Sequence, residues 1–354
     1  MMFVKTQTSI YGWGAYIPRF RIKDEEIARI WLGSTVVSSA FPVPIKEKAV
    51  INIDEDTLTM SVEAARRALK RAKINPKEIG AVLVGTESNP YAVKSAGAFV
   101  ARAINADNVI LAATYEFACK AGTEAIQTCI GLIQSKRIKY GLAIGADTAQ
   151  GKPTDELEYT AACGATAFIL GEHNPKAAAT ITAALSYVRE TPDFWRRATR
   201  PYPGHAQRFT GEPAYFHCII NAARMMLNEL NASPKDFTYA VFHQPNYKFP
   251  LKVAKVLGFS AEQVLPSIVV DRIGNIYAGS ALIGLARLLD IAKPGDSIFF
   301  VSYGSGAGSD AFVINVEEGI TEKQSLAPPV DAMIENKKYI DYALYARFRR
   351  KIMK

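Results

Sequence analysis

The chain has 354 residues, of which 49% are hydrophobic and 21% are charged, so it is long enough for a large buried core and two domain-sized halves. Its uncharged apolar runs fall short of the roughly 18 residues of a membrane span, and its first residues lack the layout of a secretory signal, so we expect a cytoplasmic protein. The net charge of +8 comes mainly from residues 337–354, which carry seven Lys or Arg and one Asp. A basic tail on a nearly neutral body argues against a nucleic-acid-binding stripe.

Hydrophobic periodicity predicts strands that alternate with helices along the chain. A strand over residues 8–17 ends at Pro18, and a helix follows over residues 23–31. Residues 33–50 have little periodicity and contain two prolines, so we expect a surface loop there. The pattern then predicts a helix over 56–73, a strand over 79–86, a helix over 93–104, a buried strand over 109–114, a helix over 121–133 and strands over 140–149 and 165–170.

The sequence contains an internal repeat. Residues 64–79 align without a gap on residues 222–237, at an offset of 158, with identities that include Ala, Ala, Arg, Leu, Pro and Lys. At an offset of 157, Ala-Gly-Thr-Glu-Ala-Ile at 121–126 matches Ala-Gly-Ser-Ala-Leu-Ile at 278–283. The chain is therefore predicted to be a duplicated α/β unit, with sheets buried between helices. We expect halves at residues 1–176 and 177–318, followed by a basic tail at 319–354.

Four polar residues follow strands or precede helices at matched places in the two repeats. Glu87 and His243 follow matched strands, whereas Cys119 and Asn275 precede matched helices. Open α/β folds place ligands at the carboxyl ends of their strands, so these side chains are expected to meet in one pocket.

Cys119 lies at a strand-to-helix turn, where the helix N-terminus favours the thiolate form. A thiolate, a carboxylate and an imidazole together suit acyl transfer with proton abstraction from carbon. Cys119 would take an acyl group as a thioester, Glu87 would remove a proton next to its carbonyl, and His243 would hold a second substrate's carbonyl. The alternative interpretation is that Cys119 is one more buried small residue; for Cys129, Cys163 and Cys218 the core interpretation is preferred. No cysteine pair has the spacing of a zinc knuckle or indicates a disulfide framework.

Several motifs resemble the thiolase superfamily, and more narrowly the hydroxymethylglutaryl-CoA (HMG-CoA) synthases of the short archaeal type. They are Glu-Phe-Ala-Cys at 116–119, Gly-Thr-Glu-Ser at 85–88, Phe-His-Gln-Pro-Asn at 242–246, Arg-Ile-Gly-Asn at 272–275, Tyr-Gly-Ser-Gly at 303–306 and Arg-Phe-Thr-Gly-Glu-Pro at 208–213. The resemblance implies a five-layer α-β-α-β-α fold. It also implies condensation of acetyl-CoA with acetoacetyl-CoA through an acetyl-cysteine, with coenzyme A thioesters as substrates and no cofactor or metal.

The resemblance also suggests residues that bind substrate and coenzyme A. Lys248 and Lys252 lie four residues apart on a predicted helix after His243, so they share one face and suit phosphate groups. The family pattern adds four further positions, Thr160, Thr210, Asn275 and Ser305. The preferred interpretation of the arginines at 196, 197 and 200 is a solvated loop, and the other histidines, at 173, 205 and 217, receive no role.

Two other functions stay open at this point. A β-ketoacyl-ACP synthase III has the same fold and nucleophile, but it forms its carbanion by losing CO₂ and needs no carboxylate base, so Glu87 argues against it. A non-catalytic CoA-binding scaffold is the other alternative. The resemblance further implies a homo-oligomer and a complex with the acetoacetyl-CoA-forming thiolase through a small zinc-ribbon/OB-fold protein. The tyrosines of the tail, at 339, 342 and 345, have helical spacing and favour packing on the chain itself over docking.

Overall fold

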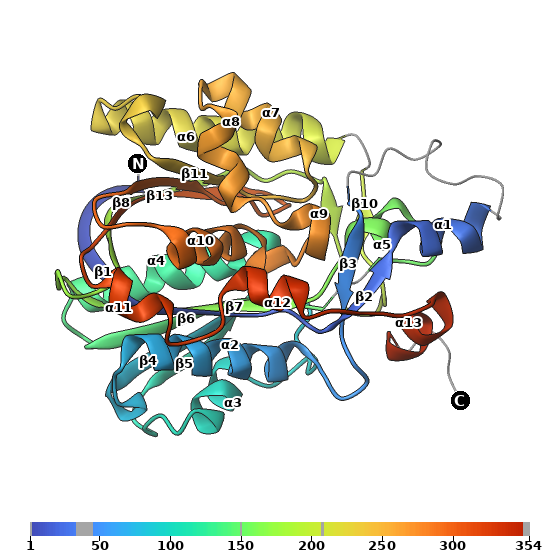
Figure 1. Cartoon of the computed structure of the whole chain (residues 1–354), viewed down its shortest axis with the longest axis horizontal. Coiled ribbons are helices and arrows are strands. Elements are labelled where there is room, and N and C mark those ends of the chain that lie inside the picture. Colours follow the sequence, from blue (N-terminus) through green and yellow to red (C-terminus); the bar gives the residue numbers. More distant parts are fainter. Residues whose placement is uncertain (1, 33–44, 149–150, 207–208, 350–354) are drawn as a thin grey trace.

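The computed structural model describes residues 2–32, 45–148, 151–206 and 209–349, and these form five alternating layers of helices and strands (Figure 1). One outer layer contains α6 (Phe216–Leu230), α7 (Lys248–Leu257) and α8 (Ala261–Val264), and the other contains α2 (Thr57–Ala72) and α3 (Ala96–Ala103). The central layer consists of α4 (Ala121–Gln134) and α10 (Ser280–Ile291), which lie between the two layers of strands. The predicted five-layer fold is confirmed.

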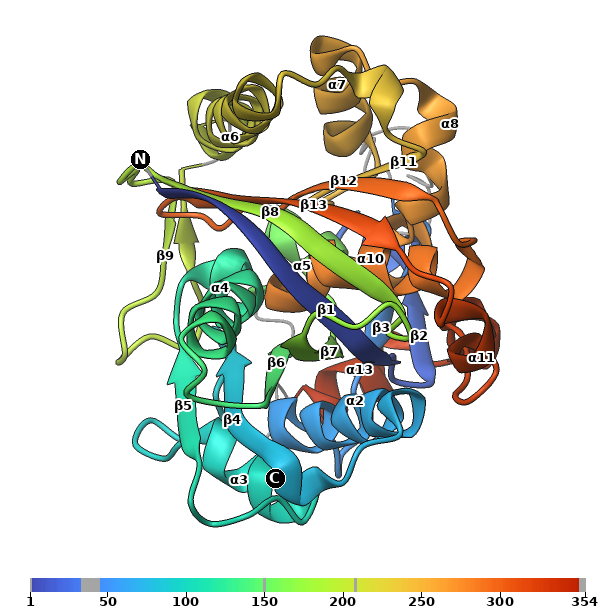
Figure 2. The ribbon, with the colours of Figure 1, turned by 90° about the vertical axis from the view of Figure 1, so that its left-hand side faces the viewer.

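Nine strands form one continuous hydrogen-bonded sheet in the order β11-β12-β13-β8-β1-β7-β6-β4-β5. The 15-residue β1 (Met2–Tyr16) joins the two strand layers, because its first part pairs with β8 and its second part with β7 (Figure 2). The sheet is mixed: β4 runs parallel to β5 and β6, β11 runs parallel to β12, and the other neighbours are antiparallel. The remaining bounds are β4 (Ile79–Gly85), β5 (Leu111–Tyr115), β6 (Tyr140–Asp147), β7 (Gly164–Glu172), β8 (Ala179–Val188), β11 (Tyr239–Phe242), β12 (Ser297–Val301) and β13 (Gly308–Val316).

The internal repeat predicted from the sequence is visible in the backbone. Lys73 and Asn231, 158 residues apart, both end a long helix in the left-handed conformation, with φ of 53° and 49°. Each is followed by a single 3₁₀ turn, at Pro76–Glu78 and at Pro234–Asp236. The second pair of matched helices begins at Ala121 and Ser280, so the structural offset there is 159 and not the 157 of the sequence alignment.

Two predictions about local structure were wrong. Residues 47–50, expected in a surface loop, form the buried strand β3 (Glu47–Val50), which pairs with β2 (Phe20–Lys23); residues 33–44 of that expected loop lie outside the described ranges. The strand expected at 109–114 is present as β5, but it lies at the edge of the sheet, and Val109 and Leu111 are 93% and 47% exposed. An apolar run shows that a strand forms, but it does not show whether a neighbour covers it.

The C-terminal segment packs first on α10 of the second half and then on elements of the first half. After α11 (Ile320–Gln324) and α12 (Val330–Glu335), the short β14 (Lys338–Tyr339) adds to β2, and α13 (Tyr342–Phe348) follows. Three further helices and two short strands complete the described elements: α1 (Asp24–Leu32), α5 (Glu156–Thr160), α9 (Val270–Ile273), β9 (Phe194–Trp195) and β10 (Gly204–His205). Tyr342 donates a hydrogen bond to Glu158 at 2.8 Å, and Tyr345 is buried. The last basic residues, 350–354, lie outside the described part, and the division at residues 176 and 318 stays a prediction.

Across the described ranges we find no helix long and apolar enough to cross a membrane.

Candidate active site

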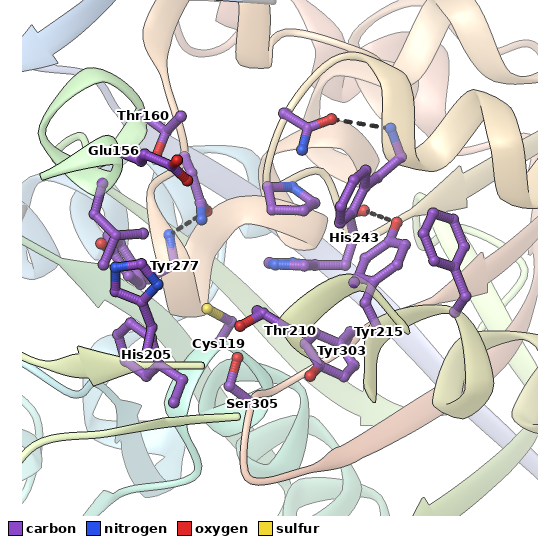
Figure 3. A pocket seen from close by; sticks show the side chains of 18 of the residues that line it. Cys119, Glu156, Thr160, His205, Thr210, Tyr215, His243, Tyr277, Tyr303 and Ser305 are labelled. Atoms are coloured by element: carbon purple, nitrogen blue, oxygen red, sulfur yellow. Dashed lines mark hydrogen bonds between the residues drawn. The ribbon is translucent and has the colours of Figure 1, made fainter. Parts of the chain in front are cut away.

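A cavity of about 530 Å³ opens where the two halves meet, and side chains from both halves line it (Figure 3). Cys119 comes from the first half, whereas His243 and Asn275 come from the second. Thr160, Thr210 and Ser305 also line this cavity. The structure thus brings together six of the nine residues singled out in the sequence. Glu87 and the two lysines lie outside this lining and are described below.

The nucleophile position is built by a turn between β5 and α4. Cys119 lies in the 3₁₀ turn Ala118–Lys120, directly before α4, and Ala118 has a positive φ of 44°. Residues other than glycine rarely adopt this conformation, so the turn is a strained feature that the surrounding packing must hold. Gly85 permits this packing, because a Cβ there would lie 2.1 Å from the backbone carbon of Ala121. The close approach places the end of β4 beside the start of α4.

Glu87 follows β4 by two residues and lies next to Cys119. The Cys119 thiol points at Glu87 Oε1 over a sulfur–oxygen distance of 4.0 Å. Glu87 lines a second cavity of about 580 Å³, together with Glu116 and Arg196, and the two cavities share Phe194 and Ser305. The carboxylate therefore lies next to the Cys119 sulfur and lines the second cavity.

Burial controls the ionisation of all three groups. Burial, followed by the charges of Asp147 and Glu116, raises the pKa of Glu87 well above its ordinary value. Burial, followed by the charges of Glu87 and Asp147, likewise raises the pKa of the Cys119 thiol. Burial and the neighbouring carboxylates act against the helix N-terminus, which the sequence analysis expected to favour the thiolate. We therefore treat Cys119 as a thiol until a base takes its proton.

His243 is a neutral imidazole at neutral pH. Burial lowers the pKa of His243 to about 3, and its Nδ1 has no hydrogen-bond partner among the described residues. Its backbone carbonyl accepts a hydrogen bond from Tyr215 at 2.5 Å, which fixes the turn after β11 (Figure 3). A neutral ring has one donor and one acceptor nitrogen, so His243 can either accept a proton or polarise a carbonyl.

Asn275 and Thr160 are held side by side by the backbone. The amide of Asn275 donates to the carbonyl of Thr160 at 2.8 Å, and the carbonyl of Asn275 accepts from the amide of Ala162 at 2.9 Å. Gly274 allows these two backbone segments to approach each other. Its φ is +79°, and a Cβ at this position would lie 2.6 Å from the Cβ of Ala162. Thr160 is the last residue of α5, so this short helix and the Gly-Asn loop form one wall of the cavity.

Thr210 and Ser305 border the cavity around Asp193, a buried residue that the sequence analysis missed. The Asp193 carboxylate accepts hydrogen bonds from Tyr303 Oη at 2.7 Å and from the amide of Gly306 at 2.8 Å. Its backbone carbonyl accepts from Thr210 Oγ1 at 3.2 Å. Asp193 therefore ties the loop that carries Ser305 to the turn that carries Thr210. No motif around Asp193 indicates this role, because the partners that tie it to the Ser305 loop, Tyr303 and Gly306, lie 110 and 113 residues away in the chain.

Neither predicted lysine lines the cavity itself. Lys248 and Lys252 are exposed on α7, and Lys252 Nζ lies 3.7 Å from the lining residue Glu212 and 4.2 Å from the ring of Phe216. They are thus at the rim on the His243 side. Arg196, in contrast, lies next to a predicted catalytic residue, because its Nη2 donates a hydrogen bond to the backbone carbonyl of Glu87 at 3.0 Å. Arg208 lies outside the described ranges.

The remaining cysteines are buried, as expected for core residues. Among the described residues we find no group of three or more His, Cys, Asp or Glu that could hold a metal ion.

Comparisons with known proteins agree with this architecture. Residues 35–164 match the model of the thiolase N-terminal domain, and residues 227–316 match the model of the 3-oxoacyl-[acyl-carrier-protein] synthase III C-terminal domain. These two models place the halves in the condensing enzymes of the thiolase superfamily but do not separate its members.

Relatives that match over nearly the full length show which member of the superfamily this chain resembles. The chain is 56% identical to a hydroxymethylglutaryl-CoA synthase of Pyrococcus furiosus over 97% of its own length and 96% of the relative's. It is also 56% identical to a hydroxymethylglutaryl-CoA synthase of Methanopyrus kandleri, over 99% of both chains. The chain belongs to the hydroxymethylglutaryl-CoA synthase family.

Solved structures of distant HMG-CoA synthases have the same fold. A structure described as MvaS in complex with 3-hydroxy-3-methylglutaryl coenzyme A superposes with a TM-score of 0.85 at 21% identity, over 99% of this chain and 93% of that one. An HMG-CoA synthase complexed with CoA gives a TM-score of 0.85 at 19% identity, over 96% and 90% of the two chains.

Proposed function

We propose that this chain condenses acetyl-CoA with acetoacetyl-CoA and water to give HMG-CoA and free coenzyme A, the HMG-CoA-forming step of the mevalonate route to isoprenoids. Membership of the HMG-CoA synthase family, at 56% identity over nearly the full length, supports the reaction. The observation that carries the proposal for the site is local: the Cys119 thiol lies 4.0 Å from the Glu87 carboxylate, beside a cavity that His243 also lines.

The first step transfers an acetyl group. Because the pKa of Cys119 is raised, its thiol must lose a proton as it attacks acetyl-CoA, and neutral His243 on the same cavity is the base we assign to this step. The sulfur bonds to the acetyl carbon, the bond to coenzyme A breaks, and the departing thiolate takes the proton back. We assign stabilisation of the oxyanion to the backbone N–H groups at the start of α4, because a helix N-terminus favours negative charge.

The second step forms the carbon–carbon bond. Glu87 removes a proton from the methyl group of acetyl-Cys119, and its raised pKa makes it a stronger base than an ordinary carboxylate. The resulting carbanion attacks the ketone carbon of acetoacetyl-CoA, which neutral His243 polarises through a hydrogen bond to the carbonyl oxygen. The proton that Glu87 removed then passes to the alkoxide that forms, so both groups return to their starting states. Asn275 and Thr160 orient the second substrate along the opposite wall. Hydrolysis of the thioester to Cys119 then releases HMG-CoA.

Lys248 and Lys252 are proposed to meet the phosphates of coenzyme A. Both are exposed at the rim of the cavity, on the first two turns of α7, where a long pantetheine arm reaching Cys119 would leave its charged end outside. Thr210 and Ser305, tied together through Asp193, are proposed to contact the arm itself.

The edge strand β5 supports a homo-oligomer. Val93 and Val109 are more than 90% exposed, and Leu111 and Tyr91 are each 47% exposed, so an apolar surface adjoins an unpaired strand edge. We infer that a second copy covers it. A complex with the thiolase and a zinc-ribbon/OB-fold protein stays a prediction from the family resemblance.

An assay of the isolated chain tests the function. The purified protein, given acetyl-CoA and acetoacetyl-CoA without any other protein, should release HMG-CoA and coenzyme A in equal amounts. Product formation without partners excludes a pure scaffold. Activity only with a malonyl thioester, with loss of CO₂, would instead indicate a β-ketoacyl-ACP synthase III and would overturn the proposal.

A further inference from the structure

The cavity contains a second histidine that the proposed condensation does not use. His205 lines the cavity together with Cys119 and Glu156, and Figure 3 shows it on the wall across from His243, with the Cys119 sulfur between them in this view. Its Nε2 lies 3.0 and 3.1 Å from the two carboxylate oxygens of Asp155. We propose that His205, oriented by Asp155, is the general base for the water that hydrolyses the thioester on Cys119. This inference rests on the proposed function.

The fold holds this pair rigidly. His205 is in β10 and pairs with Phe194 of β9, and Phe194 also lines the cavity. Asp155 caps the N-terminus of α5, because its Oδ1 accepts a hydrogen bond from the amide of Leu157 at 2.8 Å. The carboxylate is thus fixed by the helix start and the imidazole by the strand pair. The side chains of His205 and Asp155 are 14% and 24% exposed, so the pair is largely shielded but open to water in the cavity.

The hydrogen bond to Asp155 leaves the other ring nitrogen of His205 available to accept a proton. With Nε2–H donating to Asp155, the neutral ring keeps Nδ1 as its proton acceptor, and the carboxylate stabilises the imidazolium once a proton arrives. The contrast with His243 is direct, because burial lowers the pKa of His243 to about 3 and its Nδ1 has no hydrogen-bond partner among the described residues.

The other described titratable residues of the lining fit this step less well. Glu156 and Glu212 are exposed, so water screens them, and Lys252 lies beside Glu212. The three lining tyrosines, 215, 277 and 303, have raised pKa values owing to burial and cannot serve as bases. Glu87 and His243 are already assigned to the condensation. We therefore assign hydrolysis to a separate base, on another wall of the cavity.

The step balances as follows. A water oxygen bonds to the thioester carbon on Cys119 while one water proton moves to His205. The carbon–sulfur bond then breaks, and the sulfur takes the proton from His205. The new carboxyl group of HMG-CoA loses its own proton to solvent, so the enzyme returns to its starting state with Cys119 as a thiol.

The test follows three rates by intact-protein mass spectrometry after rapid mixing: acetylation of Cys119, formation of the HMG adduct and release of that adduct. His205→Gln should slow release by about 10²-fold or more, so that the adduct accumulates, while the first two rates change little. Asp155→Asn, which keeps the cap on α5, should slow release to a smaller extent. Added imidazole should restore release in His205→Ala. The matched control is His217→Gln, whose ring bonds to Tyr187 and does not line the cavity.

Either of two results overturns the inference: release that is unchanged in the His205 variants, or equal slowing of all three rates, which would indicate a structural role only. The proposed function fails separately. If the wild-type protein forms no HMG adduct, release of acetate from acetyl-Cys119 still reports on His205, and that hydrolysis should fall in the same variants.

Discussion

The two halves of the molecule repeat one backbone but support their catalytic turns differently. Ala118 and Tyr277, 159 residues apart, have nearly equal positive φ angles of 44° and 51°, and each begins a 3₁₀ turn that continues into a central helix. In the first half a charged group, Asp147, binds the segment that carries Glu87 after β4, and it also binds the 3₁₀ turn of the second half at Ala278. In the second half a neutral amide, Gln244, makes the buried side-chain hydrogen bonds next to His243.

Asp147 binds four donors at the end of β6. They are Thr86 Oγ1 at 2.8 Å, the amide of Glu87 at 2.9 Å, Ser88 Oγ at 2.6 Å and the amide of Ala278 at 2.9 Å. Gln244 also makes four hydrogen bonds, but its amide both accepts and donates. Its Oε1 accepts from the amides of Val269 and Val270, and its Nε2 donates to the carbonyls of Ser267 and Ser280.

The difference explains why each half supplies a different kind of chemistry. Burial is the main cause that raises the pKa values of Glu87 and Cys119, and the negative charge of Asp147 adds to it, which makes Glu87 a stronger base and favours the protonated form of Cys119. Around His243 the support is neutral, so burial alone acts on the ring and lowers its pKa. The two halves therefore contain similar turns. The buried side chains beside their catalytic residues differ in charge, being a carboxylate at Asp147 and an amide at Gln244.

The largest effect is expected at the nucleophile. Cys119→Ser should lower HMG-CoA formation by about 10⁴-fold, because an alcohol in this buried site is far harder to deprotonate than a thiol. Cys129→Ala, in the core of α4, is the matched control and should keep most activity. Steady-state assays check both, and near-normal turnover by the serine variant would remove Cys119 from the mechanism.

Glu87→Gln should separate the first step from the second. We expect acetylation by acetyl-CoA to continue, while condensation slows by about 10² to 10⁴-fold because the amide cannot take a proton from the methyl group. Rapid-mixing mass spectrometry measures both steps. Equal rates of condensation in the variant and the wild type would contradict the role of base.

Gln244→Met should destabilise the second half by about 3 kcal/mol, because the isosteric side chain leaves buried backbone donors and acceptors without partners. Urea unfolding measures the change in free energy, and Gln7→Met on the exposed part of β1 is the control. A change below 1 kcal/mol would show that the neutral amide does not hold this turn.

The pH dependence of stability should reveal the neutral histidine. The unfolded chain protonates His243 below about pH 6.5, whereas folding holds the pKa of this ring at about 3, so the unfolded state binds more protons in this window. The free energy of unfolding should therefore fall as the pH falls from about 6.5 toward 3, by about 1.4 kcal/mol per pH unit from this group. His243→Asn should lose less stability than the wild type over that range. Parallel curves in urea unfolding would contradict the neutral assignment.

The smallest effect is expected at the strained turn. Ala118→Gly should stabilise the protein by up to about 1 kcal/mol, since glycine adopts a positive φ without steric cost. Ala121→Gly, three residues later at the start of α4, should destabilise it by a similar amount. Thermal unfolding of the two variants decides the point, and equal losses would mean that Ala118 is not strained.

Much of this architecture was predictable from the sequence, because duplication left matched residues at fixed offsets. The offset of 158 predicted that Glu87 and His243 follow equivalent strands, and the structure places them so. Residues that act across long separations were not predictable in this way. Asp147, Asp193 and the His205–Asp155 pair lie in unremarkable local sequence, and only the fold brings His205 to the cavity and the three carboxylates to the residues that surround it.

The ionisation of Cys119 was out of reach for the same reason. A turn before a helix indicates a favourable dipole. The pKa of the thiol is raised by burial and then by the charges of Glu87, Asp147 and Asp193, and all of these depend on other strands and loops. The burial of β3 and the exposure of β5 likewise depend on neighbours that the local pattern does not specify.

The most direct measurement is peptide mass spectrometry of the Glu87→Gln protein after incubation with acetyl-CoA and then with acetoacetyl-CoA. We predict an acetyl group on the peptide that contains Cys119, unchanged in mass when acetoacetyl-CoA is added, whereas the wild-type peptide passes through the HMG adduct and returns to free thiol. An acetyl group on any other residue, or an HMG adduct formed at the wild-type rate in the variant, would contradict the account.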